Sequence, residues 1–259
     1  MRKQILPLVL AAVLSHLAAG SAAQPHLGRL AVPAGMTDGP AFTTWLRSEA
    51  ITRHAAVGEG QGAQLANALA EMALQGDGGE AMLAAGSEGL GRAAAFIGLG
   101  RTLPGATFAA EVGGTLARRF DPAGDALAAQ RLTTAWRRLS MGIVDEANRL
   151  SRGSPDRLIE VLGKAAAAGA MAERPGRSQG DQALMTQTLM QAVLEAGAPS
   201  GPTLAGLVEG GGDETIVQAV ADLDVSTIEP TAGPERPQFQ PPPVRAPIEP
   251  RRRDRVSPN

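Results

Sequence analysis

The feature that most constrains the fold is a recurrence of apolar residues at helical spacing between positions 121 and 150. The apolar positions are Leu132, Trp136, Leu139, Ile143, Ala147 and Leu150. Steps of three and four residues place them on one face of an α-helix. We expect this helix to begin at Asp121 and Pro122, because aspartate caps helices and proline fits the first turn. The apolar face packs either on the domain's own core or on a second chain, as a short coiled-coil seam.

Patterns of the same kind predict helices along most of the chain. We expect them over residues 40–56, 65–73, 155–171, 181–194, 203–209 and 213–223. The residues expected to cap helices are Asp38, Ser154, Asp181 and Asp213. Residues 80–120 are interrupted by glycines, each of which costs a helix about 0.5–1 kcal/mol relative to alanine. There we expect short, imperfect helices packed closely on their neighbours.

The fold class that follows is all-α. No segment alternates polar and apolar residues with a period of two, so we expect no sheet. We expect one irregular multi-helix domain over residues 40–226, with a sub-boundary near residue 120. Similar segments at 162–166, 189–193 and 216–220 lie 27 residues apart. Stacked helix pairs would explain such a step, and chance alignment of alanine-rich helices explains it nearly as well.

The beginning of the sequence is typical of a secretory signal peptide. Arg2 and Lys3 precede an apolar run over residues 5–14, and small residues follow at 21–23. We expect cleavage after Ala23, which gives a periplasmic or secreted protein with an extended lead-in over residues 24–39. An uncleaved anchor is the alternative, but the apolar run is shorter than the roughly 20 residues that span a bilayer. The chain has no cysteine, which excludes a lipoprotein and a disulfide framework.

The end of the sequence differs in composition from the rest. Residues 228–259 contain nine prolines and six arginines, which predicts a disordered tail over 227–259. Its candidate partner-binding residues are Pro241, Pro242, Pro243, Arg251, Arg252, Arg253 and Arg255. Proline-rich segments bind grooves on other proteins, and clustered arginines pair with anionic surfaces of the envelope. A solubilising end with no specific partner is the other interpretation. Trp136 is a further candidate partner contact on the helix face described above.

The search for catalytic, cofactor and metal motifs gives no candidate residues. His54 is expected at a helix end, where a cation suits the helix dipole. Gly86, Ser87 and Gly89 form an incomplete nucleophile elbow, which we interpret as a turn with Ser87 as a helix cap. The chain has 24 basic and 26 acidic residues, and this balance does not suggest nucleic-acid binding.

These observations favour a non-enzymatic, exported protein of the bacterial cell envelope. Its helical domain would bind another envelope protein, and the tail would be a tether or a partner ligand. One alternative is a peptidoglycan-type hydrolase with a glutamate as general acid, which requires a cleft with two or more glutamates and aromatic residues. Its candidates are Glu49, Glu71, Glu111 and Glu146. The other alternative is a peripheral membrane protein that uses residues 90–120.

Overall fold

The computed structural model describes residues 38–75, 78–151, 155–172 and 178–210, together with residues 32, 33, 36 and 153. The chain divides into two units, residues 1–222 and 223–259, and all of the described residues belong to the first. The predicted signal peptide, most of the predicted lead-in, the helix expected at 213–223 and the predicted tail lie outside the described residues.

The described part of the chain is all-α, as the sequence predicted, and it contains no strand. Its helices are α2 (Gly39–Val57), α3 (Gln61–Leu74), α4 (Gly79–Gly98), α5 (Thr102–Arg119), α6 (Ala126–Leu150), α7 (Pro155–Ala172), α8 (Gln179–Ala196) and α9 (Ser200–Glu209). None of these helices combines the length and the hydropathy needed to cross a bilayer.

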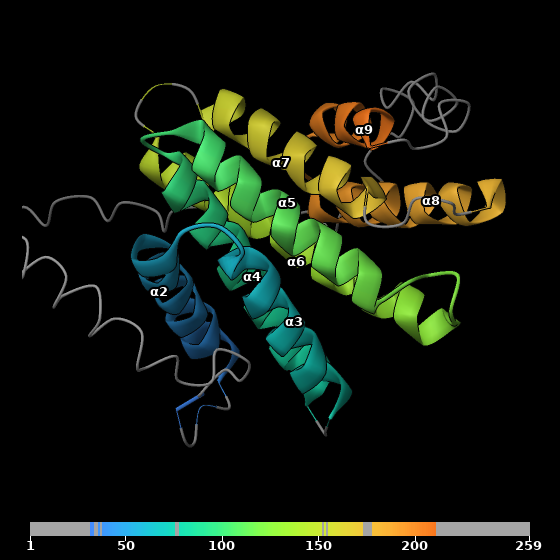
Figure 1. Cartoon of the computed structure of the whole chain (residues 1–259), viewed down its shortest axis with the longest axis horizontal. Helices are drawn as coiled ribbons and strands as arrows, with labels where there is room; N and C mark the ends of the chain where they lie inside the picture. The colour runs from blue at the N-terminus through green and yellow to red at the C-terminus, as the bar shows by residue number, and fades with distance from the viewer. Residues whose placement is uncertain are drawn as a thin grey trace, which may run out of the picture. The chain divides into compact units, whose positions relative to one another are not determined.

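The helices form two layers, because each one packs most extensively on a helix two places away from it along the chain. We call α2, α4, α6 and α8 the even layer, and α3, α5, α7 and α9 the odd layer. In Figure 1, α3, α5 and α7 run side by side nearest the viewer, and α4 and α6 lie behind them. The result is a row of stacked helix pairs, α2–α3, α4–α5, α6–α7 and α8–α9.

The stacked pairs do not follow the 27-residue step in the sequence. Segment 162–166 lies on α7 and segment 189–193 lies on α8, so the two similar segments belong to opposite layers. Segment 216–220 lies outside the described residues. The even helices begin at residues 39, 79, 126 and 179. The distance along the sequence from one helix pair to the next is therefore longer than 27 residues, and it varies.

Side-chain caps begin α2, α6 and α8, although two of the caps expected from the sequence were wrong. Asp38 caps α2 as predicted, since its carboxylate accepts a hydrogen bond from the Ala41 backbone N–H at 3.3 Å. Helix α6 begins at residue 126 and not at Asp121, because Asp125 caps it by accepting from the Ala128 N–H at 2.7 Å. Helix α8 is capped by Ser178, whose hydroxyl accepts from the N–H of Asp181, so Asp181 lies inside the helix.

Residues 80–120 form two long helices, α4 and α5, and the expectation of short, imperfect helices was wrong. The expected close packing is present. A Cβ at Gly142 of α6 would meet the Glu88 carbonyl oxygen of α4, and a Cβ at Gly91 of α4 would meet the Leu139 carbonyl oxygen of α6. Gly113 and Gly169 make the same reciprocal approach between α5 and α7. Glycine therefore lets neighbouring backbones touch, and the packing gained offsets the low helix propensity of glycine.

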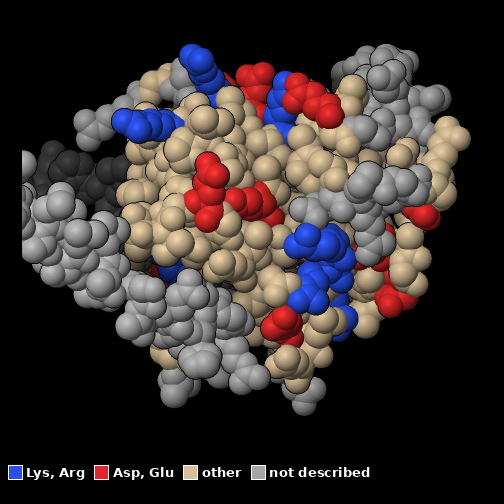
Figure 2. Space-filling view, in the orientation of Figure 1, with Lys and Arg blue, Asp and Glu red and all other residues tan. Residues whose placement is uncertain are grey.

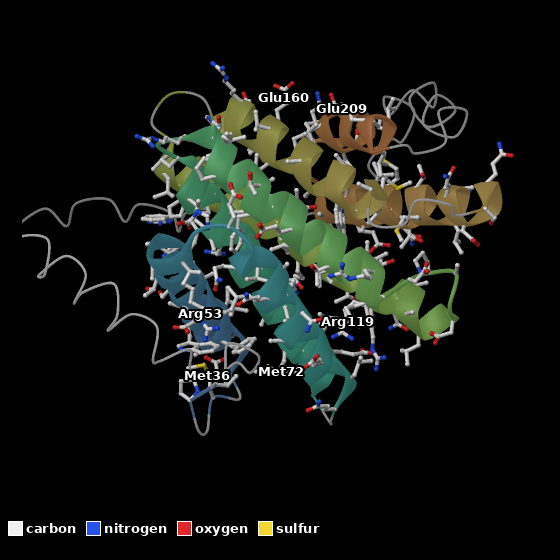
Figure 3. All side chains as sticks on the ribbon, viewed as in Figure 1. Met36, Arg53, Met72, Arg119, Glu160 and Glu209 are labelled. Carbon is white, nitrogen blue, oxygen red and sulfur yellow. The ribbon has the colours of Figure 1, made fainter. Side chains whose placement is uncertain are left out.

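One hydrophobic core runs through all the pairs, and residues on both sides of position 120 contribute to it. Its largest fully buried side chains are Trp136, Phe42, Phe108 and Phe120. Polar links join helices within each layer at the surface. Arg119 of α5, labelled in Figure 3, donates to Glu71 and Asn67 of α3, and Lys164 of α7 pairs with Glu209 of α9 at 2.6 Å.

Candidate functional site

A surface groove of about 470 Å³ lies on the even layer, along α4. Helices α2 and α6 both pack on α4 and not on each other, so they flank it. We call this depression the α4 groove. Its lining residues are Gly39, Pro40, Thr43, Thr44, Ala81, Ala84, Ala85, Glu88, Arg92 and Arg138.

The floor and one wall of the α4 groove are built from small residues. Ala81, Ala84 and Ala85 of α4 form the floor, and the first turns of α2 form the wall. The Thr43 hydroxyl donates to the Ala85 carbonyl at 2.9 Å, and Thr44 donates to its own helix, so these donors are already used. The wall is therefore fixed against the floor, and a ligand in this part of the groove would meet mainly methyl groups.

Charged side chains form the other end of the α4 groove. Glu88 accepts from Arg92 at 2.8 Å and from Arg138 of α6 at 3.4 Å. Arg92 also donates to Asp145 of α6 at 3.2 Å. Two arginines and two carboxylates give this network no net charge, so it offers both hydrogen-bond donors and acceptors to a ligand.

Beyond this network, an ion pair spans α4. Arg47 of α2 reaches over α4 to Glu146 of α6, with Nη2 to Oε1 at 2.5 Å. Arg149 donates to the same carboxylate at 2.6 and 2.9 Å. The Arg47 guanidinium also lies over the Phe96 ring, 5.0 Å from its centre. This bridge ties the first and third helices of the even layer together across the second.

The Glu146 side chain is only 1% exposed. Burial alone would raise its pKa, but the hydrogen bonds from Arg149 and Arg47 and the attraction of their charges outweigh burial and lower the pKa below its ordinary value. The same interaction raises the pKa of Arg149. Glu146 is therefore an anion in a structural bridge, whereas a general acid needs a raised pKa.

The four glutamates considered for hydrolysis do not share a cleft in the described part of the chain. Glu49 pairs with Arg53 on its own helix, and Glu71 pairs with Arg119. Glu111 accepts from the backbone N–H groups of Gly60 and Gly62 at 2.6 and 2.9 Å, where it caps α3. None of the four lines the α4 groove.

The other sites considered from sequence are placed as follows. His54 lies in the last turn of α2, with its ring edge against Phe108 at 5.9 Å between centres. Ser87 lies in the middle of α4 and is fully buried, so its interpretation as a helix cap in a turn was wrong. Among the described residues, no three histidine, cysteine, aspartate or glutamate side chains are close enough together to hold a metal ion.

Trp136, a candidate partner contact, lies in the core. It is 1% exposed and lines a small cavity between α6, α7 and the turn before α9. Of the two interpretations of the α6 face, packing on the domain's own core is the one that the structure shows. The other candidate partner residues, Pro241–Pro243, Arg251–Arg253 and Arg255, lie outside the described residues.

Sequence reasoning missed the α4 groove. The Glu88–Arg92 pair has the four-residue spacing of a helical ion pair and could have been found. The contact of Arg47 with Glu146 joins residues 99 positions apart, and no local pattern indicates it.

Comparisons of the chain with protein-family models, with curated proteins and with solved structures give no match.

Proposed function

We propose that this protein is a non-enzymatic interaction module of the bacterial cell envelope, and that it binds an extended segment of another envelope protein in the α4 groove. The observation that carries the proposal is the groove itself, which is open, floored with alanine and bordered by charged residues at one end. Export to the envelope is supported by the basic, apolar and small-residue segments of positions 1–23.

The dimensions of the groove suit an extended chain. Ala81 and Arg92 are eleven residues apart on α4, and at about 1.5 Å per residue this gives a floor of roughly 16 Å. At about 3.3 Å per residue, such a floor holds roughly five residues of extended peptide. The short alanine side chains on the floor leave room for a peptide backbone above them.

The polar end of the groove supports recognition more than catalysis. Arg92, Arg138 and Glu88 can exchange part of their mutual hydrogen bonding for bonds to a peptide backbone or side chain. Each charge there is already paired, so no carboxylate or nucleophile is held ready for chemistry. The tail over residues 227–259 would act as a tether or a second ligand for the same envelope assembly.

The test is to block the groove in the full chain. The substitution Ala81→Trp places an indole on the groove floor at an exposed position. Ala205→Trp is the matched control, because Ala205 is also exposed but lies on α9, in the other layer. Proteins that co-purify after chemical crosslinking in cells are identified by mass spectrometry. We expect Ala81→Trp to lose a partner that Ala205→Trp retains; equal partner sets for both variants would refute the proposal.

A further inference from the structure

The turn between α4 and α5 exposes apolar side chains in a short stretch. Phe96 is 41% exposed, Leu99 is 46% exposed and Leu103 is 75% exposed. Leu103 is the most exposed large hydrophobic residue in the described part of the chain. With Arg101, which lies between the two leucines, we call these residues the α4–α5 tip.

The tip is compact because the two helix ends touch. A Cβ at Gly105 of α5 would lie 2.5 Å from the Gly98 Cα of α4, so only glycine permits this approach. A turn of three residues, 99–101, then joins the helices. The exposed apolar residues consequently all lie at one end of the α4–α5 pair, where Figure 1 shows the two helices joined by a short turn.

Positive charge accompanies the apolar residues of the tip. Arg101 is exposed and makes no hydrogen bond or ion pair with the described residues. Arg47 stacks on Phe96, and it shares the single carboxylate of Glu146 with Arg149, which is 57% exposed. Two arginines on one carboxylate leave a net positive charge. Figure 2 shows basic side chains at this end of the molecule.

The geometry points to the α4–α5 tip as a docking surface for an anionic lipid membrane. Protruding apolar residues interleaved with arginine match the chemistry of the interface, since the apolar groups enter the acyl boundary while guanidinium groups bind lipid phosphates. A protein partner is the weaker choice, because a stable interface buries about 800 Å² per side and a three-residue turn offers too little area.

This inference goes beyond the proposed function and does not depend on it. Along α4, the groove occupies residues 81–92, and the tip begins at Phe96, beyond the Arg47–Glu146 bridge. A protein held at the membrane by the tip would keep the groove open to an envelope partner. The two sites can therefore fail separately, and substitutions at one leave the other intact.

The test is co-sedimentation of residues 24–259, the expected processed protein, with vesicles of phosphatidylcholine alone or mixed equally with phosphatidylglycerol. The tip variant is Leu99→Ser with Leu103→Ser. The matched control is Leu74→Ser with Leu127→Ser, because these leucines are 52% and 45% exposed at the opposite ends of the helix pairs. We expect the parent protein to prefer the anionic vesicles and the control to bind like the parent. The tip variant should bind at least about tenfold more weakly, from the apolar area it removes.

Two further variants separate the tip from other sources of binding. Arg101→Gln should weaken binding to anionic vesicles about fivefold, the effect of one arginine near a charged surface. Replacement of the four arginines at 251–253 and 255 by glutamine tests the tail, and the variant should keep the leucine-dependent part of the binding. The inference would be refuted if the parent protein bound both kinds of vesicle equally. It would also be refuted if the tip variant bound vesicles as tightly as the control variant. If the double variant does not fold, the single variant Leu103→Ser, at the most exposed position, replaces it. Its binding to the vesicles is compared with that of the control in the same way.

Discussion

Replacement of Gly142 by alanine should destabilise the protein, although alanine is the better helix former. Gly142 lies within α6, where its Cβ would overlap the Glu88 carbonyl oxygen and lie 3.1 Å from the Arg92 backbone nitrogen. Both contacts are with the backbone of α4, which cannot move aside like a flexible side chain. Overpacking of this kind costs about 1–3 kcal/mol, against a propensity gain of about 1 kcal/mol. The net change should be a loss of up to about 2 kcal/mol.

A second glycine gives the opposite expectation and serves as the control. Gly163 also lies within a long helix, α7, but its Cβ would meet only the Pro202 Cβ at 3.5 Å, an ordinary contact. Gly163→Ala should therefore raise the free energy of unfolding by about 0.5–1 kcal/mol. Urea unfolding followed by circular dichroism measures both variants. If Gly142→Ala stabilised the protein as Gly163→Ala does, the close approach of α4 and α6 would be wrong.

Three further predictions concern the bridge, the cap and export. Because the pKa of Glu146 is lowered in the folded state, its carboxylate stabilises the protein above its ordinary pKa of 4.5, and this contribution is lost as the pH falls through the folded value. Glu146→Gln should thus lower the free energy of unfolding by about 1–3 kcal/mol at pH 7, and urea titrations should show that this difference shrinks as the pH falls below the unfolded pKa. Glu111→Gln should cost about 1 kcal/mol in the same assay, because it removes the charge that caps the N-terminus of α3. Mass spectrometry of the exported protein should find Gln24 as its first residue, and an intact Met1 would contradict cleavage.

Helices and several of their ends could be predicted from sequence, because both are encoded locally. Apolar spacing indicated α2, α3 and α6, and Asp38 caps α2 through a residue only three positions away. The start of α6 was misplaced because Asp121 and Pro122 form a turn of their own, in which Asp121 accepts from the Ala123 N–H. Asp121 and Asp125, four residues apart, are both plausible caps in the sequence. Which of them caps α6 depends on the backbone conformation of residues 121–125, which the sequence pattern does not specify.

The layered packing and the α4 groove could not be predicted, because both depend on contacts between distant residues. Each glycine in α4 lowers the helix propensity of the sequence. In the structure, however, Gly91 allows the backbone of α4 to contact the backbone of α6 within the even layer. The groove exists because α2 and α6 lie on opposite sides of α4, an arrangement that no local spacing specifies. The solvent-facing leucines of the tip resemble core residues in the sequence, and only their exposure distinguishes them.

Binding of an envelope partner in the α4 groove can be tested directly in cells. Its most direct test is a photo-crosslinking amino acid placed at Ala84, within the groove, and at Ala205, outside it, in the full chain in living cells. We expect a discrete crosslinked protein from position 84 that is absent from position 205, with the attached peptide identified by mass spectrometry. No crosslink from position 84, or the same products from both positions, would contradict it.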